Sequence, residues 1–150
     1  MREQKLRFTR HMRQVLKHQP VVLVGTSDDQ GQLNVSPKCT LKIVGDDQLV
    51  FADLCSRKTR ANVRANSRMT VAAVDLRTYE GYQFKGWAEL MEEGPLFDEI
   101  ADLLARSRNG PQPMELWFEK AARELTAALG RAGQHKVRPS HVVVLHIEEI

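Results

Sequence analysis

The sequence predicts one domain of the mainly β class, a small antiparallel β-barrel of six strands with helices at its periphery. Five apolar runs of strand length precede residue 92 and follow one another through short turns, which is typical of antiparallel sheets that close into barrels. A short helical stretch follows the third of these runs. Apolar residues at helical spacing then occupy much of 95–131, before a last strand.

Length and composition limit the class of protein. The 150 residues are 42% hydrophobic, enough for one core, so we expect a single domain over residues 1–150. Apolar runs are too short to span a membrane and no signal sequence is visible, so we expect a cytoplasmic protein. The formal net charge of +3 is too small to predict nucleic-acid binding. Cys39 and Cys55 match neither a metal-binding spacing nor a disulfide framework, and we expect both to be reduced.

Residues 1–18 predict a basic N-terminal helix, with sparse apolar positions among arginines and lysines over 2–18. Basic amphipathic helices can bind membranes or nucleic acid. The apolar stripe is narrow here, which favours a solvated helix docked by a few apolar residues. Pro20 ends the helix.

The next two strands predict a hairpin. Residues 21–26 form the first strand, residues 27–31 carry turn chemistry, and residues 33–43 form the second strand. Pro37 cannot donate a ladder hydrogen bond, so we expect it at an edge or a bulge. A further turn at 45–47 leads into the third strand, residues 49–54.

Two more strands, residues 69–76 and 82–91, follow the short helix through a turn at 78–81. Alternation along the second of them separates two faces. One face carries Tyr82, Phe84, Gly86, Ala88 and Leu90, and the other carries Gln83, Lys85, Trp87 and Glu89. Residues 95–131 then predict a helical insertion of two helices, the second over 115–129, and residues 141–147 predict the last strand.

Hydroxyl and cationic side chains gather where the third strand gives way to the short helix. They are Ser56, Arg57, Lys58 and Thr59. A helix N-terminus offers unpaired N–H groups and a partial positive charge, so this group predicts an anion site. The alternative is a solvated basic turn with Ser56 or Thr59 as a plain N-cap, and these residues alone favour it.

No metal or nucleophilic site is predicted. The five histidines show no zinc-ligand spacing with a third partner, so we expect surface or half-buried histidines and no metal. The sequence also indicates no Ser-His-Asp or Cys-His arrangement.

Five segments, in order, resemble the FMN-binding split-barrel family, the pyridoxamine 5′-phosphate oxidase-like proteins. They are VGTSDDQGQLNVSPK (24–38), LVFAD (49–53), RKTRANV (57–63), MTVAAV (69–74) and FKGWAEL (84–90). The resemblance covers roughly residues 18–92 and the last strand. It implies a six-stranded antiparallel split β-barrel with a short helix after strand three and the helical insertion 95–131 before the last strand.

The resemblance implies FMN at a homodimer interface. The phosphate would be held at the start of the short helix by Ser56, Arg57, Lys58 and Thr59, with Asn62 one turn on. The isoalloxazine would lie against Ser36, Pro37 and Lys38 and against Phe51, Ala52, Asp53 and Leu54. Lys38 would place positive charge near the N1–C2 carbonyl side of the flavin, whereas without the resemblance it reads as a solvated edge-strand lysine.

A strand of the second subunit would complete the flavin site. Gln83, Lys85 and Trp87 share one strand face and would supply a polar contact, a cation and a stacking plane. The alternative is a polar outer face with the tryptophan packed under a helix.

The resemblance leaves the substrate open. True pyridoxamine 5′-phosphate oxidases end in a basic, tryptophan-containing segment, and this chain ends VLHIEEI, so we expect a different activity. Shorter relatives include FMN electron-transfer proteins, haem-handling members and members that use F420. We therefore expect a small dimeric flavoprotein, an oxidoreductase or electron-transfer protein with an unassigned redox partner. The alternatives are an F420-dependent reductase and a flavin-free binding or regulatory module that uses the basic first helix.

Overall fold

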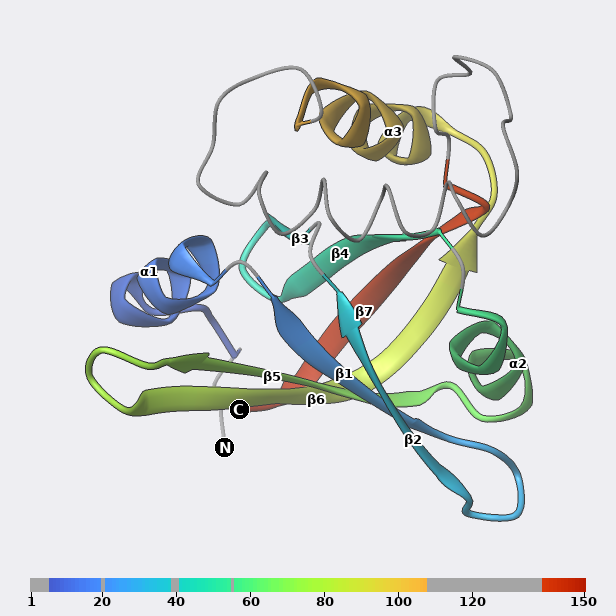
Figure 1. Ribbon diagram of the computed structural model, residues 1–150, viewed down its shortest axis with the longest axis horizontal. Coiled ribbons are helices and arrows are strands. Elements are labelled where there is room, and N and C mark those ends of the chain that lie inside the picture. The colour runs from blue at the N-terminus through green and yellow to red at the C-terminus, as the bar shows by residue number, and fades with distance from the viewer. Residues whose placement is uncertain (1–5, 20, 39–40, 55, 108–138) are drawn as a thin grey trace, which may run out of the picture.

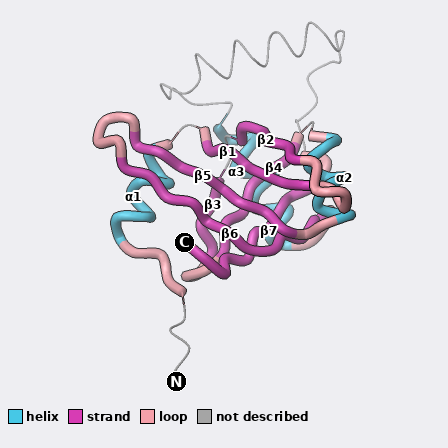
Figure 2. Tube along the Cα trace, turned by 90° about the horizontal axis from the view of Figure 1, so that it is seen from below, coloured by secondary structure: helices cyan, strands magenta, loops and turns pink. Residues whose placement is uncertain are grey.

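The computed structural model describes residues 6–19, 21–38, 41–54, 56–107 and 139–150, and the statements that follow concern these residues. Seven antiparallel strands form one curved sheet in the order β2-β1-β5-β6-β7-β4-β3 (Figure 1). Helices α1 and α2 lie at opposite ends of this sheet, as Figure 2 also shows. The half-open, mainly β sheet with peripheral helices confirms the predicted split-barrel fold.

The first hairpin is confirmed. β1 (Val22–Ser27) pairs with β2 (Leu33–Lys38), and the Asp28 carboxylate closes the turn by accepting the backbone N–H of Gln30 at 3.0 Å and of Gln32 at 2.8 Å. β2 is an edge strand, so the position of Pro37 at an edge is also confirmed.

The single strand predicted over residues 33–43 is wrong. The chain forms β2 and then β3 (Leu41–Val44), which lie at opposite edges of the sheet, so the sheet has seven strands rather than six. β3 pairs only with β4 (Gln48–Asp53) in a second tight hairpin. The alternation of Leu33 and Val35 continues through Leu41 and Ile43, so the change of pairing partner leaves no signal in the periodicity.

The remaining described elements are α1 (Arg10–His18), α2 (Arg57–Ala65), β5 (Arg68–Asp75), β6 (Glu80–Met91), α3 (Pro95–Ser107) and β7 (His141–Glu149). The start predicted for the first helix is wrong over residues 6–9, because Thr9 caps the helix by accepting the Met12 N–H at 3.2 Å. α3 confirms the start of the helical insertion, and the second predicted helix, 115–129, lies outside the described residues.

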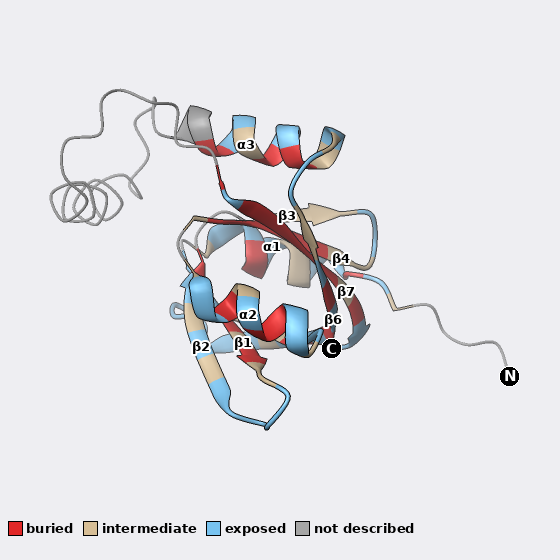
Figure 3. Cartoon of the chain, turned by 90° about the vertical axis from the view of Figure 1, so that its right-hand side faces the viewer, coloured by how far each residue is buried: buried red, intermediate tan, exposed pale blue. Residues whose placement is uncertain are grey.

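The core has two parts that share strands β4 and β7. One face of these strands, with Leu49, Phe51, Val143 and Leu145, packs inside the barrel. The other face, with Val50, Ala52, Val142 and Val144, packs against α3 (Figure 3). Both strands are therefore buried on two sides, and a polar side chain at their ends must find its partners within the protein. No helix in the described ranges is long and apolar enough to cross a membrane.

Candidate functional site

The N-terminus of α2 carries unpaired donors and two cations. Ser56 occupies the N-cap position, but its side chain makes no capping hydrogen bond, and the first turn contains no acidic residue. The first-turn N–H groups are therefore not satisfied by a cap, and Arg57 and Lys58 are exposed beside them. This combination of donors, helix dipole and positive charge favours an anion.

The Ser56 hydroxyl makes no capping hydrogen bond, and it accepts a hydrogen bond from Lys38 instead. Lys38 ends β2, its side chain is only 6% exposed, and its ammonium donates to the Ser56 hydroxyl. The same ammonium donates to Asp53 Oδ1 at 3.0 Å, and the Ser56 backbone N–H donates to that oxygen at 2.9 Å. The interpretation of Lys38 as a solvated edge lysine is wrong.

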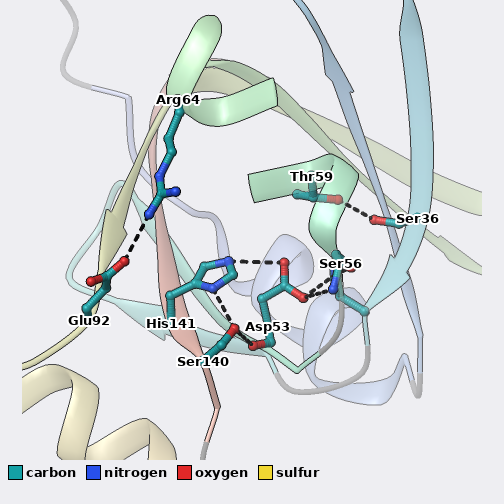
Figure 4. Close-up of polar contacts among 9 residues, drawn as sticks. Ser36, Asp53, Ser56, Thr59, Arg64, Glu92, Ser140 and His141 are labelled. Carbon is teal, nitrogen blue, oxygen red and sulfur yellow. Dashed lines mark hydrogen bonds and ion pairs between the residues drawn. The ribbon is translucent and has the colours of Figure 1, made fainter. Parts of the chain in front are cut away.

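Asp53 is the buried centre of this group. Its Oδ2 lies 3.2 Å from His141 Nε2, close enough for an ion pair (Figure 4). The ring N–H is not directed at the oxygen, so neither atom has a hydrogen-bond partner among the residues described. Burial alone would raise the pKa of the Asp53 carboxyl, but His141, the Lys38 cation and the Ser56 amide together hold that pKa well below its ordinary value. Asp53 is therefore a buried carboxylate.

Two side-chain pairs fasten α2 to the first hairpin. The hydroxyls of Ser36 and Thr59 lie 3.1 Å apart, and Asn62 donates to the Thr26 hydroxyl at 3.0 Å. Thr59 and Asn62 are both buried. Their roles in this structure are to connect α2 to β1 and β2, and this fixes where the N-terminus of α2 points.

The two cations of the site differ in their partners. Lys58 Nζ lies 3.2 Å from Asp28 Oδ2, in a pair that is partly exposed. The Gln32 backbone N–H, with Lys58, holds the pKa of Asp28 below its ordinary value. Arg57 is exposed and has no hydrogen-bond or ion-pair partner within the described part of the chain. Its guanidinium is free to bind an anion.

Only some of the residues expected to contact the isoalloxazine lie close together in the structure. Ser36, Lys38 and Asp53 lie at the start of α2, and Pro37 is exposed on the edge strand. The side chain of Phe51 is fully buried inside the barrel. Ala52 and Leu54 pack with the cluster beneath α3. These last three side chains face the cores, so a ligand at α2 would meet the backbone of this strand rather than its side chains.

Gln83, Lys85 and Trp87 lie on the outer face of β6, as predicted, and not at the start of α2. Lys85 pairs with Glu149 at 2.5 Å and lines a groove of about 640 Å³ that also includes residues of β1, β2 and β5. Trp87 stacks on His146 at 3.9 Å between ring centroids, so the interpretation of a tryptophan packed under a helix is wrong.

Sequence reasoning missed His141 and Ser140. His141 is 1% exposed, so the expectation of a surface or half-buried histidine is wrong at this position. Ser140 Oγ donates to the Asp53 carbonyl at 3.0 Å and lies 2.7 Å from His141 Nδ1. His141 stands opposite Asp53 in the β4–β7 pairing, so only that pairing could have revealed the contact. His135 lies outside the described residues. The described residues hold no group of three acidic, histidine or cysteine side chains suited to a metal ion.

A family model described as pyridoxamine 5′-phosphate oxidase matches residues 8–150. No curated protein matches the sequence. Among solved structures, HupZ of Group A Streptococcus is 25% identical with a TM-score of 0.67, covering 94% of this chain and 90% of that one. An FMN-binding protein of Syntrophomonas wolfei is 17% identical with a TM-score of 0.59, covering 90% and 78%. HutZ, described as the heme storage protein of Vibrio cholerae, is 13% identical with a TM-score of 0.59, covering 96% and 92%. The last two similarities show the fold.

Proposed function

Because the chain belongs to the pyridoxamine 5′-phosphate oxidase family, we propose that it is an FMN-binding flavoprotein whose cofactor phosphate binds at the N-terminus of α2. The observation that carries this proposal is the helix start that no side chain caps, flanked by Arg57 and Lys58. A phosphate dianion fits this group, because its oxygens can accept hydrogen bonds from the free N–H groups and its charge can balance that of both cations.

The flavin ring would extend from this phosphate towards the end of β2. Ser36, Pro37 and Lys38 form the end of that edge strand, whose outer edge has no strand neighbour in the described sheet. Lys38 is already paired with Asp53, so the flavin would meet a fixed, compensated lysine rather than a free charge. FMN, when bound, supplies the electron chemistry, and these residues bind and orient it.

We further propose a homodimer, in which the second copy covers the outer face of β2, β1, β5 and β6. This face carries apolar side chains that are open to solvent in the single chain, among them Leu33 at 86% and Val35 at 66% exposed, with Leu23 and Val74. Lys85 belongs to the same face, because the register runs from Val35 through Gly25 and Thr70 to Lys85. Gln83, Lys85 and Trp87 would thus stand at the interface, where they can contact the partner's flavin.

We propose that the protein is a cytoplasmic oxidoreductase or electron-transfer protein. F420 is the alternative cofactor, since its phosphate would use the same helix start and the same two cations. The second alternative is a flavin-free module that binds a partner through α1. Fewer cations are available for such a partner than the sequence suggests, because Arg7 and Arg13 both pair with Asp46. Arg10 and Lys17 are the exposed cations of that helix.

An absorption spectrum of the purified protein, before and after loading with FMN and removing the excess, tests the proposal. Flavin bands that stay with the protein support it. A colourless protein that retains no FMN contradicts it, and titration with F420 then separates an F420 reductase from a flavin-free module. A haem spectrum in place of a flavin spectrum would also contradict it.

A further inference from the structure

A flat stack of two aromatic rings lies on the outer face of β6 and β7. The rings of Trp87 and His146 are 3.9 Å apart between centroids, with 8° between their planes. Trp87 stands opposite His146 in the β6–β7 pairing, so the strand register brings both side chains to one face of the sheet. Trp87 nevertheless stays 38% exposed, which is unusual for so large an apolar side chain on a strand.

The imidazole of this stack is held at both ring nitrogens. Gln48 Nε2 lies 3.2 Å from His146 Nδ1, and Glu89 Oε1 lies 2.9 Å from His146 Nε2. Gln48 stands opposite His146 on β4, and Glu89 follows Trp87 by two residues on the same face of β6. These contacts come from the strands on both sides of β7, so they restrict rotation of the imidazole. The indole that stacks on a held ring is itself held in one plane.

The second face of the indole has no ring or cation against it among the residues described. Arg68 is the neighbour of Trp87 on β5, but its guanidinium pairs with Glu148 instead. Aromatic rings stack well on a further planar ring. A side chain that is already held also loses little conformational freedom when a ligand binds. The arrangement therefore favours a planar aromatic ligand on Trp87.

Polar groups beside Trp87 indicate what the edge of such a ring would carry. Lys85 precedes Trp87 by two residues on the same face, pairs with Glu149 and lines the groove of about 640 Å³. Thr70 stands opposite Lys85 on β5 and lines the same groove. The Thr70 hydroxyl is buried and has no hydrogen-bond partner among the residues described. A ring with carbonyl or N–H groups at its edge would supply the missing partner.

We infer that Trp87 is a stacking surface for a planar aromatic ring with polar edge groups, and that His146 is the positioning residue that holds Trp87 ready for it. This inference deepens the proposed function, and it rests on that function for the identity of the ring, which is the isoalloxazine of the flavin held by the second copy. His146 does not touch the ligand and acts only through Trp87.

The fluorescence of Trp87 tests the inference. Trp117→Phe leaves Trp87 as the one tryptophan of the sequence. The probe is lumiflavin, the flavin ring without its ribityl phosphate, added to FMN-free protein, so that the start of α2 does not contribute. We expect lumiflavin to quench Trp87, and His146→Ala to weaken its binding roughly three- to tenfold, the cost of ordering one freed side chain. A wild-type Trp87 that lumiflavin does not quench overturns the inference.

Two further variants separate positioning from a general loss of structure. His146→Phe keeps a ring against the indole but loses both hydrogen bonds, so its lumiflavin affinity should lie between those of the wild type and His146→Ala. His18→Ala is the matched control: His18 is exposed on α1 and bonds the Gln14 carbonyl, so wild-type affinity is expected. Equal affinity in the wild type and His146→Ala overturns the inference, as does a His146→Phe that recovers nothing.

A measurement without a variant at His146 keeps the inference testable if His146→Ala does not fold. In time-resolved anisotropy the held indole of Trp87 should turn only with the whole protein, and a fast local rotation overturns the inference. Failure of the proposed function has a different signature. If lumiflavin stacks on Trp87 and FMN is not retained, the flavin proposal fails and the stacking surface stands. If FMN is retained and does not quench Trp87, the stacking surface fails and the flavin proposal stands.

Discussion

Removing the Arg57 guanidinium gives the sharpest test of the phosphate site. This side chain is exposed and has no partner among the described residues, so Arg57→Ala should change the free energy of unfolding by no more than about 0.5 kcal/mol. A hydrogen bond to a charged group contributes about 1.5–3 kcal/mol, which corresponds to a loss of FMN affinity of roughly ten- to a hundredfold. Lys58→Ala should fall at the lower end of this range, because Lys58 Nζ already lies 3.2 Å from the Asp28 carboxylate.

The assay is quenching of FMN fluorescence at fixed ionic strength, with Arg64→Ala as the control. Arg64 lies in the last turn of the same helix and pairs with Glu92, so its loss removes the same charge away from the helix start. The control should lose less than about threefold in affinity, as expected for a distant, screened charge. Wild-type affinity in both Arg57→Ala and Lys58→Ala, or an equal loss in Arg64→Ala, would refute the assignment of the phosphate to α2.

Three further outcomes follow from the same contacts. Asp28→Asn should tighten FMN binding a few-fold in the same titration, because it frees Lys58 and removes a nearby negative charge while the asparagine oxygen can still close the turn; weaker binding would contradict this. Asp53→Asn should lower the free energy of unfolding at neutral pH by about 3–5 kcal/mol, since it leaves Lys38 without its buried partner. The folded-state pKa of Asp53 is lowered, so the wild type should lose this stabilisation as the pH falls below about 4. Urea unfolding should then show a smaller difference in free energy of unfolding between the wild type and Asp53→Asn. A difference that stays constant with pH would count against the Lys38–Asp53 pair. The double variant Leu33→Asp and Val35→Asp should convert a dimer into a monomer in light scattering, and a monomeric wild type would remove the interface.

The parts of the fold that the sequence predicted are those encoded by local chemistry. The hairpin turn of Asp28 and Gly31, the edge position of Pro37 and the alternating faces of β6 each depend on residues close in sequence. The break between β2 and β3 is not predicted because it is a change of pairing partner between two strand-like segments with the same alternation, which composition and periodicity do not record.

The candidate site likewise has a part that local sequence predicts and a part that depends on strand pairing. Ser56, Arg57 and Lys58 are adjacent in the chain, so their gathering at a helix start was predictable from spacing alone. His141 stands opposite Asp53 only because β7 pairs with β4 across most of the chain length. A histidine in a short apolar strand carries no local signal that a buried carboxylate will meet it.

The contacts of Lys38 bear on the two interpretations that the sequence left open for residues 56–59, an anion site or a solvated turn with a plain N-cap. A serine at an N-cap position normally accepts a first-turn N–H, and in that state the helix start would have less capacity for an anion. Here the hydroxyl of Ser56 accepts from Lys38 instead, and the helix has no side-chain cap. The lysine can be held in this buried place because Asp53 neutralises it, and the other oxygen of Asp53 lies 3.2 Å from His141 Nε2. The uncapped start of α2 therefore lies against a buried charge arrangement to which β2, β4 and β7 each contribute a residue.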